Sequence, residues 1–151
     1  MLKEGDLAPD FTLPDQEGNP TTLSHLRGRT VVLFFYPRAD TPGCTAEACG
    51  FRDMAERFRE RGVELLGIST DPPRAQAKFA EKYGLPMRLL ADTEHKVAEL
   101  YGVWVEKKRY GRSYMGVERQ TFVIGPDGRL VKVFHKVKPE GHAAEVLSAL
   151  S

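Results

Sequence analysis

The sequence has very little cysteine and no recognisable set of metal ligands. Its 151 residues include two cysteines, Cys44 and Cys49, which lie five positions apart. A structural zinc site takes four ligands at short spacings, and none of the four histidines has such a spacing to another histidine or to a cysteine. The pair also lacks the C-x-x-C spacing of dithiol oxidoreductases. We therefore expect no metal and no cofactor, and we interpret the histidines as surface residues.

Strong charge of either sign and long apolar segments are also missing. Lys and Arg number 22 against 21 for Asp and Glu, so there is no basic surplus that would indicate nucleic-acid binding. The longest apolar run spans residues 31–36, whereas a membrane helix needs about 20 residues. The first residues, MLKEGDLAPDF, are too polar for a signal peptide. We expect a cytoplasmic protein that binds neither nucleic acid nor membrane.

Phosphate-binding glycine motifs are absent as well. Neither G-x-G-x-x-G nor G-x-x-x-x-G-K-[ST] occurs, so the usual indication of nucleotide binding is missing. One local basic cluster is present, at Lys107, Lys108, Arg109 and Arg112. We interpret it as a solvated turn or hairpin in preference to a binding patch.

Apolar periodicity predicts alternating strands and helices within one domain, residues 1–151. Continuous apolar runs at 30–36 and 63–69 indicate buried strands, and a short strand is expected within 85–92. Helical spacing indicates helices that end at Gly62 and Gly84, a helix over 94–101 and a last helix near residue 146. Turn residues predict hairpins around 17–20 and 126–128.

This order of elements predicts an α/β fold. Early alternation of strand and helix favours parallel pairing through right-handed crossovers, and the late hairpin adds antiparallel strands. The expected architecture is a mixed central sheet flanked by helices, with an N-terminal β-hairpin extension.

The residues around Cys44 indicate a reactive thiol. Thr41 suits the N-cap of a helix and Pro42 its first position, which places Cys44 in the first helical turn. N–H groups there lack partners within the helix, and the helix dipole adds positive potential. Both effects favour the thiolate, which is the reactive form of cysteine. The alternative is a small buried thiol without chemistry.

Cys49 raises a geometric question. In a continuous helix, five residues correspond to about 7.5 Å of rise and about 140° of rotation, so the Cα atoms lie roughly 8.6 Å apart. A disulfide needs about 7 Å or less. Either the two thiols never bond, or the first helical turns unwind first. A packed, unreactive Cys49 remains the alternative.

The stretch YPRADTPGCTAEACGFRD contains Pro37-x-x-x-Thr41-x-x-Cys44 and resembles the active site of the peroxiredoxins. It is most similar to their bacterioferritin comigratory protein branch, also called peroxiredoxin Q, which has a second cysteine five residues after the first. The segments GDLAPDFTLPDQEG, VELLGISTDP and ERQTFVIGPDG extend the resemblance along the chain.

The resemblance implies a thioredoxin-like fold and thiol-dependent reduction of hydrogen peroxide and small organic hydroperoxides. It makes Cys44 the peroxidatic cysteine, which becomes a sulfenic acid. Thr41 corresponds to the hydroxyl that bonds sulfur and substrate, Pro37 to the residue that shields the pocket, and Arg119 to the guanidinium that stabilises the developing charge.

By the same resemblance, Cys49 is the resolving cysteine, which forms an intramolecular disulfide after residues 43–49 unwind. Thioredoxin or a similar dithiol would reduce that disulfide, and a monomer is expected. A thiol–disulfide oxidoreductase is disfavoured by the missing C-x-x-C and by Glu118-Arg119-Gln120, where such enzymes have a cis-proline. A redox sensor without turnover remains open.

Four other residues have no single predicted role. A Cys44–His135 hydrolase pair is disfavoured, although a histidine can come from far along the chain. Glu47 either forms a local hydrogen bond or is solvated. Trp104 is expected in the core or at an interface, and Tyr36 either lines the pocket mouth or belongs to the core.

Overall fold

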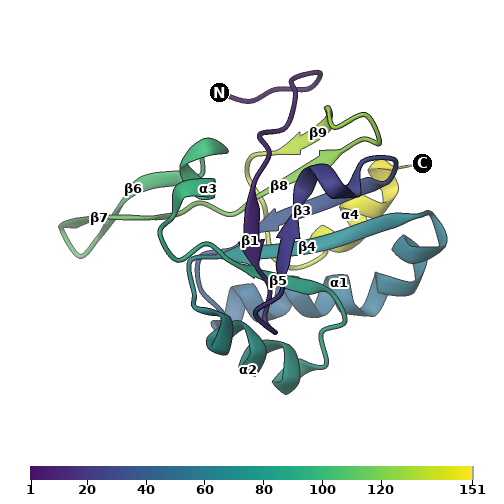
Figure 1. The fold of residues 1–151 in the computed structure, drawn as a ribbon. Coiled ribbons are helices and arrows are strands. Elements are labelled where there is room, and N and C mark those ends of the chain that lie inside the picture. The colour runs from purple at the N-terminus through teal and green to yellow at the C-terminus, as the bar shows by residue number, and fades with distance from the viewer. Residues whose placement is uncertain (151) are drawn as a thin grey trace.

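A computed structural model describes residues 1–150, which form a central sheet covered on both faces (Figure 1). The sheet has five strands in the order β5-β4-β3-β8-β9. Their bounds are β3 Thr30–Phe35, β4 Val63–Ser69, β5 Arg88–Ala91, β8 Gln120–Ile124 and β9 Leu130–Phe134. Strands β3, β4 and β5 are mutually parallel, whereas β8 is antiparallel to β3 and to β9. The mixed sheet expected from the sequence is confirmed.

Helices and short strands complete the chain. The helices are η1 Leu23–Leu26, α1 Pro42–Glu60, α2 Pro73–Tyr83, α3 Lys96–Leu100 and α4 His142–Ala149. Two separate hairpins are β1 Thr12–Pro14 with β2 Pro20–Thr22, and β6 Trp104–Arg109 with β7 Arg112–Val117. Helix α1 ends before Gly62 and α2 before Gly84, and both glycines have positive φ. Glycine adopts this conformation at little cost, which explains why both helices end there.

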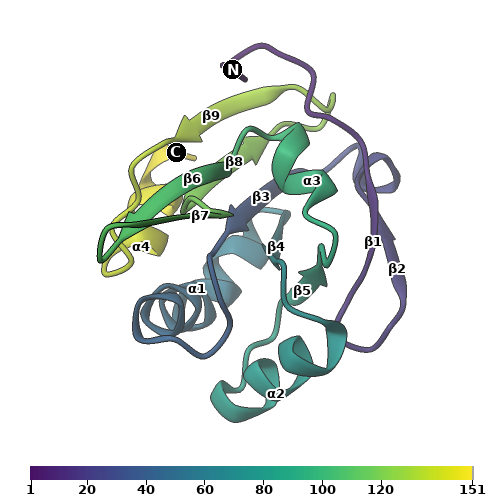
Figure 2. The ribbon, with the colours of Figure 1, turned by 90° about the vertical axis from the view of Figure 1, so that its left-hand side faces the viewer.

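The two faces of the sheet carry different covers. Figure 2 shows α1, α2 and α4 on one face, with the β1–β2 hairpin and α3 on the other. Strand β3 is central and is buried from Val31 to Phe35. Because successive side chains of a strand point to opposite faces, Leu33 and Phe35 join the core beneath α3, whereas Val32 and Phe34 join the core beneath α1. This explains why the sequence of β3 is continuously apolar.

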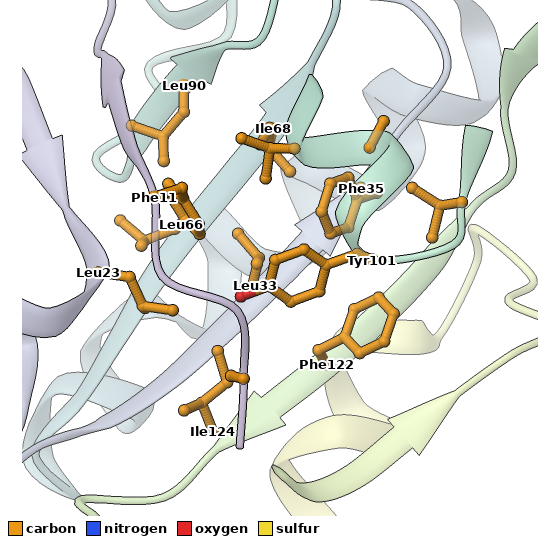
Figure 3. Close-up of a cluster of buried hydrophobic side chains, with 14 of the residues drawn as sticks. Phe11, Leu23, Leu33, Phe35, Leu66, Ile68, Leu90, Tyr101, Phe122 and Ile124 are labelled. Atoms are coloured by element: carbon orange, nitrogen blue, oxygen red, sulfur yellow. The ribbon is translucent and has the colours of Figure 1, made fainter. Parts of the chain in front are cut away.

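Aromatic rings fill much of the core beneath α3 (Figure 3). Tyr101 lies 5.4 Å from Phe35 and 5.1 Å from Phe122, measured between ring centroids. On the opposite face of the sheet, Gly67 of β4 is tightly packed. A Cβ atom on Gly67 would come within 2.9 Å of both Leu89 and Phe34. A larger residue there would displace Leu89 or Phe34, so the packing on the α1 face depends on that position. These contacts hold β3 in place, and β3 leads directly into the functional site.

Most element predictions are confirmed. The basic cluster lies on a hairpin, which is one of the two alternatives expected for it, although β6 and β7 are not among the predicted strands (Figure 1). The expectation that all histidines lie on the surface is wrong for His142, which is 1% exposed. Its Nε2 lies 2.7 Å from Thr121 Oγ1 and its Nδ1 lies 2.8 Å from Glu145 Oε1. These partners satisfy the ring, and burial lowers the pKa of His142.

Within residues 1–150, no helix is long and apolar enough to cross a membrane.

Candidate active site

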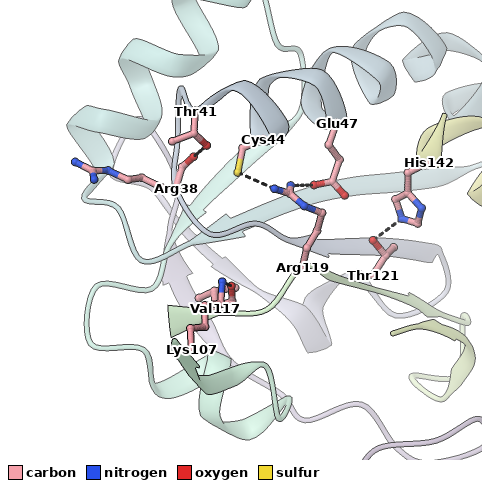
Figure 4. A network of polar contacts seen from close by, with 9 residues as sticks. All are labelled: Arg38, Thr41, Cys44, Glu47, Lys107, Val117, Arg119, Thr121 and His142. Carbon is pink, nitrogen blue, oxygen red and sulfur yellow. Dashed lines mark hydrogen bonds and ion pairs between the residues drawn. The ribbon is translucent and has the colours of Figure 1, made fainter. Parts of the chain in front are cut away.

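The site begins where β3 passes into α1. Thr41 occupies the N-cap of α1 and Pro42 the first helical position, so Cys44 is the third residue of the helix, as predicted. The Thr41 hydroxyl does not cap the helix; it donates to the Arg38 carbonyl at 2.7 Å (Figure 4). This contact fixes the loop that precedes the first turn. The first N–H groups of α1 therefore retain the positive potential expected at a helix start.

The sheet register brings Arg119 to this point. Strands β3 and β8 are antiparallel, and Phe35 at the end of β3 lies opposite Gln120 at the start of β8. Arg119 immediately precedes β8, so it reaches the beginning of α1 although it is far away in sequence. Its Nη2 lies 3.4 Å from the Cys44 sulfur (Figure 4). The predicted proximity of Arg119 and Cys44 is confirmed.

Cys44 is buried yet retains a cationic neighbour. The residue is 2% exposed and belongs to the apolar core that includes Phe51. Burial alone would disfavour a charged sulfur, whereas the guanidinium and the start of the helix favour one. Cys44 therefore combines the burial of a core thiol with a guanidinium contact at 3.4 Å.

Glu47 is a second acidic partner of the same guanidinium. Both expectations for it, a local hydrogen bond or solvation, are wrong, because it is buried and its partner is distant in sequence. Arg119 Nη1 donates to Glu47 Oε1 at 2.8 Å. Glu47 is 0% exposed, and its other oxygen, Oε2, has no hydrogen-bond partner. Burial raises the pKa of Glu47 to about 7, against the opposing effect of Arg119. Burial lowers the pKa of Arg119, but Glu47 and Cys44 raise it by more, so Arg119 stays charged.

The helical periodicity of the sequence indicates that Glu47 is buried. Cys44, Glu47, Ala48 and Phe51 recur at i, i+3, i+4 and i+7, which is the spacing of one helix face. All four are buried in α1. The apolar face recognised from Phe51 onward therefore extends back to Cys44, and it carries one carboxylate inward.

Four of the five residues expected to form the site line a common cleft of about 920 Å³. Pro37, Thr41, Cys44 and Arg119 contribute to one side of it. The β6–β7 hairpin lines the other side with residues that include Trp104, Lys107, Arg109, Arg112 and Met115. Three residues of the basic cluster, Lys107, Arg109 and Arg112, therefore line the same cleft as Cys44. Trp104 belongs to this cleft and also stacks on His95, with ring centroids 4.1 Å apart.

Two other candidates lie away from the cleft. Tyr36 is 1% exposed and packs between Phe34 and Phe79. It therefore belongs to the core and does not line the mouth of the pocket. His135 is exposed and borders a separate hollow with Met1 and Tyr101, so the structure gives no support to a Cys44–His135 pair. Among residues 1–150, no group of three or more His, Cys, Asp or Glu side chains could hold a metal ion.

Cys49 lies in the same uninterrupted helix as Cys44. Helix α1 runs from Pro42 to Glu60, and both thiols are free. Cys49 is half-buried and does not line the cleft. The continuous helix expected for the pair is confirmed. In this conformation ideal helix geometry puts the two Cα atoms roughly 8.6 Å apart, which is too far for a disulfide.

Comparisons with known proteins identify the family of this chain. The AhpC/TSA family matches residues 5–133. Peroxiredoxin Bcp of Bacillus subtilis is 48% identical over 149 residues, covering 99% of this chain and 95% of that protein. The crystal structure of peroxidoxin BcpB from Mycobacterium tuberculosis superposes with a TM-score of 0.88 at 46% identity, covering 99% of this chain and 97% of the other.

A third relative has a described activity. The bacterioferritin comigratory protein of Xanthomonas campestris, whose structures concern its alkyl peroxide reduction activity, has a TM-score of 0.91 at 35% identity and covers 99% of this chain and 96% of its own. The thioredoxin-like fold expected from the sequence is thereby confirmed. The chain belongs to the AhpC/TSA family and, within it, to the Bcp peroxiredoxins.

Proposed function

We propose that this protein is a thiol-dependent peroxidase in which Cys44 attacks the peroxide. One observation carries the proposal: the Cys44 sulfur lies at the start of α1, 3.4 Å from the Arg119 guanidinium, in a cleft. The thiolate attacks one peroxide oxygen and the O–O bond breaks. The sulfur becomes a sulfenic acid, and the leaving oxygen takes up a proton as an alcohol or water.

Three residues support this attack. Arg119 stabilises the thiolate and the negative charge that develops on the leaving oxygen. Thr41 lines the cleft beside Cys44, and its hydroxyl, held by the Arg38 carbonyl, orients the peroxide. Pro37 borders the same cleft and limits the access of water to the sulfur.

Cys49 completes the proposed cycle as the resolving cysteine. Its sulfur attacks the sulfenic acid, an S–S bond forms and water leaves. Because α1 holds the two residues too far apart, residues 43–49 unwind before this step. A dithiol protein of the thioredoxin type then reduces the disulfide and regenerates both thiols.

The activity described for one relative and the size of the cleft both indicate the class of substrate. The Xanthomonas campestris protein is described by its alkyl peroxide reduction activity, and the cleft of about 920 Å³ leaves room for more than hydrogen peroxide. We propose hydrogen peroxide and small organic hydroperoxides as substrates. The cycle needs no second chain, so we further propose a monomer with one domain over residues 1–151, acting in the cytoplasm.

Two other functions would use the same thiol: that of a thiol–disulfide oxidoreductase and that of a redox sensor. A thiol–disulfide oxidoreductase would use a C-x-x-C pair, and neither cysteine has one. A redox sensor would share the thiolate chemistry without rapid turnover. Measured peroxide consumption with a thioredoxin system separates the sensor from the peroxidase.

Stopped-flow oxidation of the wild type, Cys44→Ser and Cys49→Ser by hydrogen peroxide tests the proposal. We expect no fast reaction in Cys44→Ser, because the nucleophile is gone. Cys49→Ser should react as fast as the wild type, stall as a sulfenic acid and over-oxidise. Mass spectrometry identifies each product. Equal oxidation rates in all three proteins would contradict both role assignments.

A further inference from the structure

Glu47 has an unusual position for a carboxylate. It lies between Cys44 and Cys49 in the sequence, within the segment that unwinds during the proposed cycle. In the folded protein it is fully buried, and Oε2 has no partner. An ionised carboxyl is costly to bury unless it is paired. Its contact with Arg119 at 2.8 Å is the only ion pair of Glu47 among the described residues.

This contact joins two separate parts of the chain. Glu47 belongs to α1, whereas Arg119 lies immediately before β8. The guanidinium uses Nη1 for Glu47 and Nη2 for the Cys44 sulfur (Figure 4). Glu47 therefore determines where Arg119 can place its second nitrogen. It also ties the first turns of α1 to the sheet.

Other charged groups reach Arg119 from neighbouring elements. His142 of α4 and Lys107 of β6 both interact with it electrostatically. Lys107 donates to the Val117 carbonyl, and His142 is held by Thr121 and Glu145. Neither offers the guanidinium an acceptor, so Glu47 and Cys44 are the side chains that hold it.

In the proposed cycle, oxidation of Cys44 changes the charges that surround Arg119. In the reduced protein, one cation faces a thiolate and a carboxyl group. When the sulfur becomes a sulfenic acid, its negative charge is lost and its contact with Arg119 weakens. The Glu47–Arg119 pair is then the principal charged contact that still holds residues 43–49 in the helix. Opening breaks this pair, which costs free energy because it leaves the largely buried Arg119 guanidinium without its carboxylate partner.

We propose that Glu47 is a positioning residue that holds Arg119 against Cys44 in the reduced protein and ties the first turns of α1 closed until the sulfur is oxidised. The inference rests on the proposed peroxidase function and extends it. It predicts opposite effects on two steps. Loss of the carboxylate slows peroxide attack, because Arg119 is less well placed, and speeds disulfide formation, because α1 opens more readily.

The test compares Glu47→Gln with Glu60→Gln, which removes the same charge from an exposed position of the same helix. Single-turnover oxidation by hydrogen peroxide, quenched and analysed by mass spectrometry, separates attack from disulfide formation. For Glu47→Gln we expect attack to slow roughly tenfold, which is less than the roughly hundredfold or greater effect of losing a well-placed donor outright, because Arg119 is displaced but not removed. Disulfide formation should accelerate severalfold, and over-oxidation at high peroxide should fall. Glu60→Gln should match the wild type.

Arg119→Ala provides a second variant, because it removes the other half of the pair. It should also slow attack and speed disulfide formation, and in its background Glu47→Gln should have no further effect on attack. A merely structural role predicts instead a lower melting temperature with both steps slowed together. That result, or rates for Glu47→Gln equal to the wild type, would overturn the inference. Neither result bears on the peroxidase proposal, which fails instead if Cys44→Ser still reacts rapidly with peroxide or if the wild type shows no peroxide turnover with a thioredoxin system.

Discussion

At the level of single side chains, the site depends on one cation that serves two acidic groups. Arg119 contacts Cys44 and Glu47 through different nitrogens. The two acidic groups differ in their position relative to the cleft. The Cys44 sulfur borders the cleft, whereas the Glu47 carboxyl is fully buried. Because a buried carboxyl resists ionisation, Glu47 changes charge much closer to neutral pH than an exposed glutamate does.

This raised pKa predicts a pH-dependent stability difference between the wild type and Glu47→Gln. Below pH 4.5, the ordinary pKa, Glu47 is protonated in both the folded and unfolded states. Between pH 4.5 and about 7 the folded protein retains a proton that the unfolded chain has lost, so stability falls as pH rises. At 1.36 kcal/mol per pKa unit, the wild type should lose at most about 3 kcal/mol relative to Glu47→Gln across this window.

Denaturant unfolding of the reduced proteins at several pH values measures that difference. His142 has a lowered pKa and acts in the opposite sense, because its stabilising effect is lost as pH falls below its ordinary value of 6.5. It is present in both proteins, so its contribution cancels. Stability curves that run parallel from pH 4.5 to pH 8 would show that Glu47 has no raised pKa.

At the level of elements, α1 must satisfy two demands. In the proposed cycle, its first turns hold Cys44 against Arg119 for peroxide attack, and the same turns open for Cys49 to react. Two glycines lie within or beside these turns, at Gly43 and Gly50. A Cβ atom on Gly43 would lie 3.1 Å from Arg119 Nη2, whereas one on Gly50 would meet only Ala143 at 3.6 Å. The first is a tight contact, and the second is ordinary packing.

Alanine at these two positions should therefore act on different steps. Alanine is favoured over glycine in a helix by up to about 1 kcal/mol. Gly43→Ala displaces the guanidinium, so we expect slower peroxide attack. Gly50→Ala leaves Arg119 in place, so attack should be unchanged, while the firmer helix slows disulfide formation by at most about fivefold.

The single-turnover assay that separates these steps also checks both variants. The prediction for α1 fails if Gly50→Ala slows peroxide attack as strongly as Gly43→Ala does.

At the level of the whole molecule, charge is balanced overall but not locally. The chain has a net charge of +1, yet the cleft around Cys44 carries five cationic residues and no carboxylate: Arg38, Lys107, Arg109, Arg112 and Arg119. A cleft lined by charges of one sign attracts ligands of the opposite sign. The β6–β7 hairpin contributes three of these cations and projects from the body of the protein (Figure 1).

This asymmetry predicts a preference for negatively charged peroxides. A hydroperoxide that carries a carboxylate should oxidise Cys44 faster than its uncharged amide, and the difference should shrink as salt rises, since charges are screened over about 10 Å at 0.1 M. Arg112→Gln should reduce the preference without changing the rate with hydrogen peroxide. Stopped-flow measurements over a range of ionic strength provide the check. Equal salt dependence for the acid and the amide would show that the cationic lining does not act on the substrate.

Much of this fold follows from local patterns. The buried strands β3 and β4, the helix stops at Gly62 and Gly84, and the start of α1 at Thr41 and Pro42 all lie where the sequence predicts them. Each depends on neighbours in the chain: a continuous apolar run, a glycine with positive φ, or a proline whose missing N–H costs nothing at a helix start. Cys44 in the first turn of a helix is determined in the same way.

What the sequence by itself determined is therefore the order of the elements and the place of the reactive sulfur on α1. The motif around Cys44 also indicated the family. Only the tertiary structure decided which distant groups surround that sulfur. The antiparallel register of β3 with β8 brings Arg119 to Cys44, packing turns Glu47 inward, and the fold places the β6–β7 cations across the cleft. Local patterns cannot determine these contacts, because each joins side chains that are brought together only when the sheet and its helices pack.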